Sequence, residues 1–65
     1  FIETEVSMNP ENTFHVKFEE VKQYLEEYNY RLFGIYEQVQ EWPTKKPILR
    51  RVNAVFIAQT IYNTV

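Results

Sequence analysis

The absence of cysteine is the strongest constraint on how this 65-residue chain can fold. Without cysteine the chain forms no disulfide and no thiolate metal site, and its one histidine, His15, excludes a cage of several histidines. A domain of about 60 residues buries only about 60% of the surface that its unfolded chain exposes. We therefore expect hydrophobic burial, within the chain or against a partner, to supply its stability.

The composition provides apolar surface for this burial. Hydrophobic residues make up 45% of the chain and aromatic residues 17%, which is typical of a folded core. The formal net charge of −2 gives no overall positive field, so we expect no nucleic-acid partner. No apolar run approaches the about 20 residues of a membrane span, and no signal-peptide pattern opens the sequence. We therefore expect a cytoplasmic protein without a membrane partner.

The first half of the chain predicts a strand and then a helix. Residues 1–8 alternate between two faces, one of them apolar, and Asn9-Pro10 ends this pattern. Apolar side chains then recur at spacings of three and four, as on one face of a helix; they are Phe18, Val21, Leu25 and Tyr28. We expect Thr13 to cap the start of this helix, and Asn29, which tolerates a left-handed backbone, to follow its end.

The second half predicts two further strands. Residues 30–39 are rich in aromatic and β-branched side chains, and Gly34 among them indicates a bulge or the close approach of another element. Residues 40–47 contain Trp-Pro and Lys-Lys-Pro and predict a loop. Residues 53–59 are almost continuously apolar, which is typical of a strand buried on both faces. We expect Phe56 to lie at the centre of the core.

This order predicts an α/β fold, a β-α-β-β segment with a mixed three-stranded sheet and one packed helix. A helix between two strands is typical of a crossover between parallel strands. We place the third strand, the most apolar one, antiparallel between the first two. Because Phe1 already stands in the strand pattern, we expect residues 1–65 to be a single partial domain of a longer protein.

Four stretches of the chain together resemble the C-terminal end of the FkbM family of class I methyltransferases. Residues 2–7 form an acidic strand of the E-V type, and residues 18–25 read F-x-E-V-x-x-x-L. Residues 30–36 hold a Gly-aromatic pair, and residues 50–56 read R-R-x-N-A-x-F. Asn29 stands where the family commonly has glycine. The resemblance covers residues 1–58, and its motifs are packing patterns rather than catalytic signatures.

The resemblance implies the fifth strand, the following helix, and the sixth and seventh strands of the methyltransferase sheet, with the seventh antiparallel between the other two. It implies a parent that transfers a methyl group from S-adenosylmethionine, usually to a hydroxyl oxygen of a sugar, polyketide or similar metabolite. The family's glycine-rich cofactor loop and ribose-binding acid lie upstream and are absent here. We therefore expect S-adenosylmethionine in the full-length parent, but no cofactor and no activity in this chain alone. The alternative is a small non-enzymatic α/β binding or structural module.

Candidate substrate-binding residues lie where the first strand ends, because ligands of α/β sheets bind beyond the carboxyl ends of parallel strands. These candidates are Glu5, Ser7, Asn9 and His15. His15 could also serve as a general base, although a lone histidine is more often a surface residue. Glu3 shares a face with Glu5 and the pair could do acid–base work, but a solvated face is the simpler explanation. We assign no catalytic residue and no metal ligand.

Two further features concern partners. Four basic residues lie within seven positions and could meet phosphate, with Trp42 stacking on bases, although charge runs are usually solvated loops; they are Lys45, Lys46, Arg50 and Arg51. The expected main partner is the remainder of the methyltransferase domain. Alone, the first strand would leave backbone groups unpaired, and we expect self-association through it.

Overall fold

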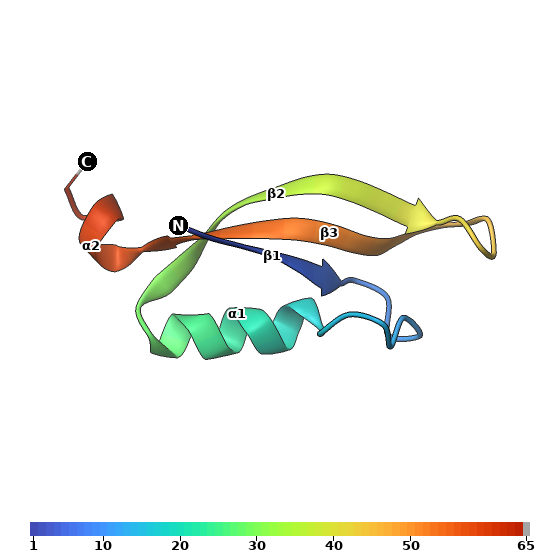
Figure 1. Cartoon of the computed structure of the whole chain (residues 1–65), viewed down its shortest axis with the longest axis horizontal. Coiled ribbons are helices and arrows are strands. Elements are labelled where there is room, and N and C mark those ends of the chain that lie inside the picture. Colours follow the sequence, from blue (N-terminus) through green and yellow to red (C-terminus); the bar gives the residue numbers. More distant parts are fainter. Residues whose placement is uncertain (65) are drawn as a thin grey trace.

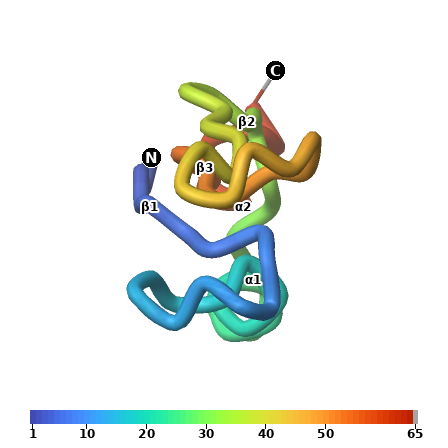
Figure 2. The backbone as a smooth tube through the Cα atoms, turned by 90° about the vertical axis from the view of Figure 1, so that its right-hand side faces the viewer, coloured from blue at the N-terminus to red at the C-terminus, as the bar shows by residue number. Residues whose placement is uncertain are grey.

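The computed structural model describes residues 1–64 and contains one sheet and two helices (Figure 1). The elements follow one another as β1 (Ile2–Ser7), α1 (Phe18–Glu27), β2 (Tyr30–Glu41), β3 (Lys46–Ala58) and the short α2 (Gln59–Tyr62). The three strands lie in the order β1-β3-β2. Viewed along the length of the molecule, α1 forms a second layer beneath the strands (Figure 2). The expected strand, helix, strand, strand order is confirmed.

β3 lies at the centre of the sheet and pairs antiparallel with both neighbours. Its Ala54 lies opposite Thr4 of β1 on one side and Ile35 of β2 on the other. The predicted position and direction of the third strand are confirmed. The prediction of a mixed sheet is wrong, because β1 and β2 run parallel but β3 separates them, so every pairing is antiparallel.

The core lies between α1 and one face of the sheet. Alternation along the strands directs Val6, Val52, Ala54 and Phe56 toward this layer, where they are buried with Leu25 of α1. Phe56 is the largest fully buried side chain, as predicted.

The other face of β3 is only half-covered. Val55 and Ile57 on that face are partly exposed, so the prediction that residues 53–59 are buried on both faces is wrong. The physical reason is that the single long helix covers one side only. A continuous apolar run therefore does not lead to two-sided burial here.

The start of α1 differs from the prediction, whereas its end agrees with it. Lys17 is the N-cap residue and no side chain caps the helix, so the prediction of Thr13 is wrong. Glu19 and Glu20 lie in the first turn, where the helix dipole favours negative charge. Asn29 follows the helix with φ 65°, as predicted.

Two predictions about α1 and β2 concern single side chains. Tyr28 was expected on the apolar stripe but is 61% exposed, because it lies at the end of the helix, beyond the last residues that face the sheet. Its ring packs against the ring of Tyr24 at a tilt of 48°, with the ring centroids 5.1 Å apart. A register shift between Leu32 and Gly34 confirms the predicted bulge.

The β2–β3 hairpin is longer than the sequence indicated. Residues 40, 41, 46 and 47 belong to strands, so the connection shrinks to Trp42–Lys45. Lys45 has a φ of 58° in this turn, and a further register shift lies between Tyr36 and Val39. Neither helix in residues 1–64 is long and apolar enough to cross a membrane.

We predict that Phe56→Ala unfolds the chain or nearly does so. Truncating a fully buried Phe costs roughly 3–5 kcal/mol, which is comparable to the whole stability of a domain of this size. Ile57→Ala, on the half-covered face of the same strand, is the matched control with a smaller expected loss. Thermal melting followed by circular dichroism measures both. A Phe56→Ala melt within a few degrees of wild type would contradict this packing.

Candidate functional site

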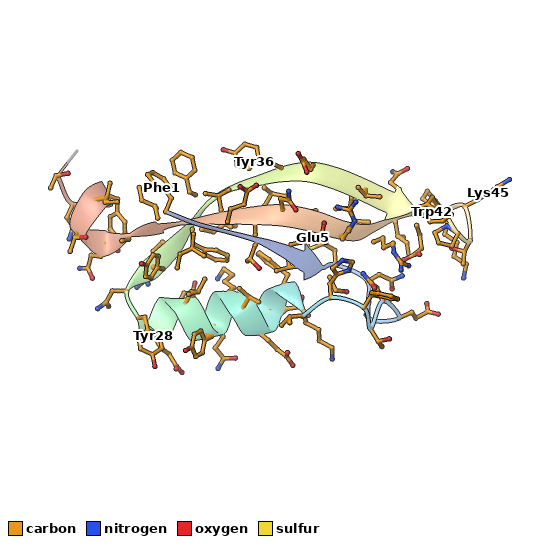
Figure 3. All side chains as sticks on the ribbon, in the orientation of Figure 1. Phe1, Glu5, Tyr28, Tyr36, Trp42 and Lys45 are labelled. Atoms are coloured by element: carbon orange, nitrogen blue, oxygen red, sulfur yellow. The ribbon has the colours of Figure 1, made fainter. Side chains whose placement is uncertain are left out.

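A cluster of polar side chains lies at the C-terminal end of β1, near the labelled Glu5 (Figure 3). It joins the end of β1, the loop of residues 8–17 and the adjoining ends of β2 and β3. We call it the end cluster; its members are Glu5, Ser7, Asn9, Asn12, His15, Glu41, Arg50 and Arg51. Three elements that are distant in sequence therefore meet through polar contacts at this end of the sheet.

Side-chain bonds to the backbone shape the loop. The Ser7 hydroxyl bonds to the carbonyl oxygens of Asn9 and Asn12, at 2.9 and 3.0 Å. The Asn9 and Asn12 side-chain oxygens accept bonds from the backbone N–H groups of Glu11 and Phe14. Short polar side chains commonly support turns in this way. Ser7, Asn9 and Asn12 are all buried, so their first role is to hold the loop in one shape.

A buried carboxylate ties this loop to the hairpin. Glu41 at the end of β2 is 5% exposed. One of its oxygens accepts a 2.7 Å bond from Asn9 Nδ2, and the other accepts a 2.8 Å bond from Arg50 Nη1. The bond from Asn9, assisted by Arg50, lowers the pKa of Glu41 although burial opposes this shift. The contacts of Glu41 therefore favour its charged form and join the loop of residues 8–17 to β2 and β3.

The hydrogen bonds of His15 define its tautomer. Asn12 Nδ2 donates to the Arg50 carbonyl and lies 3.1 Å from His15 Nδ1, while Asn12 Oδ1 accepts from Phe14 N–H. In the neutral ring, His15 Nδ1 is therefore the acceptor and Nε2 carries the hydrogen, which points to Glu5 Oε1 at 2.8 Å. Both ring nitrogens are occupied, so this arrangement does not favour a general-base role for His15.

Glu5 lies between two cationic or donor groups. His15 contacts one carboxylate oxygen and Arg51 Nη1 contacts the other, each at 2.8 Å. The acid–base pair considered for Glu3 and Glu5 is not supported, because both Glu5 oxygens are held while Glu3 stands exposed. Arg50 and Arg51 are bound to Glu41 and Glu5, so the four basic residues do not form one free patch.

The structure thus brings together all four candidates from the sequence, which are Glu5, Ser7, Asn9 and His15. Sequence reasoning missed Asn12 and Glu41 and assigned no role here to the two arginines. The two asparagines, each followed two residues later by a backbone donor in a polar loop, were the available signal. No local signal marks the Glu41–Arg50 pair, because the length of the hairpin decides that contact.

The polar groups of the end cluster are held in place by bonds to one another. No buried side-chain nitrogen or oxygen in residues 1–64 lacks a hydrogen-bond partner. A pocket of about 240 Å³ lies between the loop and the hairpin. Its lining offers carboxylate, amide, hydroxyl and cationic groups; it consists of Asn9, Glu11, Glu41, Pro43, Thr44, Lys46 and Arg50. This pocket is smaller than the roughly 300–1,000 Å³ of typical small-molecule sites, so it has room only for a small ligand.

The described residues do not fit S-adenosylmethionine or a metal. The one glycine, Gly34, lies within β2, and the Tyr36 ring fills the space beside it, so no glycine-rich loop can approach a cofactor. The chain has no aspartate. Residues 1–64 hold no group of three or more potential metal-ligating side chains.

The chain matches no protein-family model, no curated protein and no solved structure.

We predict that Asn12→Ala destabilises the fold by about 1–3 kcal/mol, because it removes a buried amide and leaves its part-buried partners unsatisfied. Thr13→Ala is the matched control: Thr13 is the next residue, is exposed, and does not cap the helix. Chemical denaturation measures the two changes in the free energy of unfolding. Equal effects of both variants would show that the Asn12 bonds do not support the loop.

We further predict that Glu41→Gln destabilises the chain at neutral pH but not in acid. The pKa of Glu41 is lowered by folding, so its contribution is present above the unfolded pKa and is lost as pH falls through the folded pKa. The stability difference between wild type and Glu41→Gln should therefore shrink below about pH 4. Glu26→Gln is the control, since the pKa of Glu26 is also lowered, mainly by Lys22, but at the helix surface. A difference that persists unchanged at low pH would refute this role of the Glu41 carboxylate.

Proposed function

We propose that this chain forms the C-terminal part of an S-adenosylmethionine-dependent O-methyltransferase domain of the FkbM type. The observation that carries the proposal is the strand order β1-β3-β2, with β3 antiparallel to both neighbours. The sequence resemblance implies this order for the fifth, seventh and sixth strands of that sheet. The helix between β1 and β2 also lies where the resemblance requires one.

The outer edge of β1 supports the proposal. The Ser7 N–H group points away from β3 and donates to the carbonyl oxygen of Val16. The Met8 N–H group points toward β3 and donates to the carbonyl oxygen of Arg50. Backbone groups alternate along a strand, so the N–H groups of Glu3 and Glu5 also point away from β3. Only Ser7 is covered, through its bridge to Lys17. An open edge of this kind suits a neighbouring strand of a larger sheet.

Uncovered apolar surface gives further support. An apolar groove of about 440 Å³ runs between the β1 edge and α1; it is lined by Ile2, Thr4, Val16, Glu20, Val21, Tyr24 and Leu25. On the opposite face of the sheet, Phe1 and Phe33 pack edge to face at 5.1 Å yet are 63% and 54% exposed. Apolar surface of this kind commonly marks an interface, and the missing part of a methyltransferase domain would cover it.

In this proposal the chain completes the sheet and supplies one wall of the substrate site. The end cluster lies at the carboxyl end of β1, which is the side where ligands bind in α/β sheets. Asn9 and the adjoining pocket would contact the methyl acceptor, while Ser7 and His15 would hold the loop in position. The upstream part of the parent would bind S-adenosylmethionine, the methyl donor.

We predict that the 65-residue chain alone does not bind S-adenosylmethionine, because it contains no glycine-rich loop. Titration calorimetry should give no dissociation constant below about 100 μM, which corresponds to about 5.5 kcal/mol of specific contact. Tighter binding would mean that these residues form a cofactor site of their own. It would contradict the proposal that the upstream part of the parent binds S-adenosylmethionine.

We also predict that the isolated chain self-associates through β1. Glu3→Pro removes an N–H that points outward and should weaken the association while preserving the fold. Thr4→Pro is the matched contrast: its N–H points toward β3, so this change should disrupt the sheet itself. Sedimentation velocity at about 100 μM compares the three proteins, since open edges pair at such concentrations. A strictly monomeric, fully folded wild type would contradict the proposal.

The second candidate is a small non-enzymatic binding or structural module. It is favoured by one observation, that the buried polar side chains of residues 1–64 are all satisfied within the chain. The upstream reading frame separates the two. A glycine-rich strand-loop-helix within about 150 preceding residues is expected for the methyltransferase. A stop codon directly before Phe1 would favour the module.

A further inference from the structure

The tip of the β2–β3 hairpin is, after the open edge of β1, the second surface feature that suits a binding partner. We define the hairpin tip as residues 42–48. It projects at the end of the molecule away from α2, where Trp42 and Lys45 are labelled (Figure 3). The molecule measures 43 Å along its longest axis but only 19 and 13 Å across, so the tip is a narrow, accessible projection.

The hairpin tip combines apolar and cationic side chains without an acidic one. Trp42 is 71% exposed and Ile48 44% exposed. Lys45 and Lys46 are exposed and form no ion pair among residues 1–64. The neighbouring Arg50 is bound to Glu41, and Lys46 adds a weaker electrostatic attraction to the same carboxylate. The two lysines therefore supply positive charge that no direct ion pair holds at this end.

We propose that the hairpin tip inserts into the headgroup layer of an anionic membrane surface. Tryptophan is enriched at the membrane–water interface, where its apolar ring and its N–H are both satisfied. Lysine extends its ammonium toward anionic headgroups while its stem stays in the interface. A projecting tip reaches a flat surface more readily than a recessed site does. This contact needs no spanning segment. It departs from the expectation of no membrane partner, which rested on the absence of a long apolar run.

The charge around the tip favours this partner over nucleic acid. Single-stranded nucleic acid is bound by a cationic groove with several stacking aromatic side chains, whereas the tip offers one aromatic ring and two free cations. The nearest acidic groups are Glu41, which is neutralised by Arg50, and Glu11, which lines the pocket beside Lys46. α1, which carries further glutamates, lies back from the tip along the molecule (Figure 1). Charges beyond a Debye length of about 8 Å are largely screened at physiological ionic strength.

Trp42 is the single tryptophan of the chain, so its fluorescence reports on the tip alone. The test uses the full chain with vesicles of phosphatidylcholine, with and without phosphatidylglycerol. The expected result is a blue shift of Trp42 emission with the anionic vesicles, little change with phosphatidylcholine alone, and reversal in high salt. Brominated lipids should quench the emission. An unchanged spectrum with anionic vesicles would overturn the proposal, as would a shift produced by oligo(dT) but not by vesicles.

Charge variants distinguish the contribution of the tip lysines to vesicle binding from the effect of the net charge of the chain. Lys45→Glu combined with Lys46→Glu should weaken vesicle binding at least about tenfold, since each surface lysine contributes about 1 kcal/mol. Lys17→Glu combined with Lys22→Glu alters net charge equally but away from the tip, and should weaken binding far less. Equal loss in both double variants would show non-specific attraction and overturn the proposal. The assay contains no S-adenosylmethionine, so its outcome is independent of the proposed methyltransferase function.

Discussion

The buried cluster that contains Phe56 of β3 and Leu25 of α1 is the packing on which the rest of this structure depends. Within residues 1–64, β3 is the only strand that bonds to both others, and Phe56 is its largest fully buried side chain. β1 and β2 are not paired with each other, because β3 lies between them. α1 covers only the face of the sheet on which Phe56 lies. The fold therefore has a single core layer that holds one helix and three strands together.

The one-sided core explains why apolar side chains remain exposed elsewhere on the surface. A single helix can cover one face of a three-stranded sheet, so Phe1 and Phe33 remain in solvent on the other face. The same geometry leaves the outer edge of β1 open beside an apolar groove. By contrast, the polar end of the molecule is complete, because Asn9, Glu41 and Arg50 satisfy one another. The contrast between an incomplete apolar periphery and a complete polar end is what a part of a larger α/β domain would present.

The sequence was sufficient wherever local rules act. Alternation located β1, the spacing of Phe18, Val21 and Leu25 located α1, and Asn29 marked the helix end through its tolerance of positive φ. The strand order followed from the apolar character of β3.

Features set by tertiary structure were not predictable in this way. The length of the hairpin and the Glu41–Arg50 pair depend on cross-strand register. The folded loop makes Lys17, rather than Thr13, the N-cap residue of α1. The four candidate residues were found together because they all lie at or after the end of one strand, but their hydrogen bonds could only be known from the folded loop.

Amide hydrogen exchange at β1 tests the central claim, that this chain is the end of a larger sheet, most directly. In the 65-residue chain, at concentrations low enough to keep it monomeric, the amides of Glu3 and Glu5 should exchange rapidly while those of Thr4 and Val6 are protected by β3. In the product of the complete reading frame, a neighbouring strand should protect all four. Rapid exchange of Glu3 and Glu5 in that longer protein, or a reading frame that adds nothing before Phe1, would contradict the account.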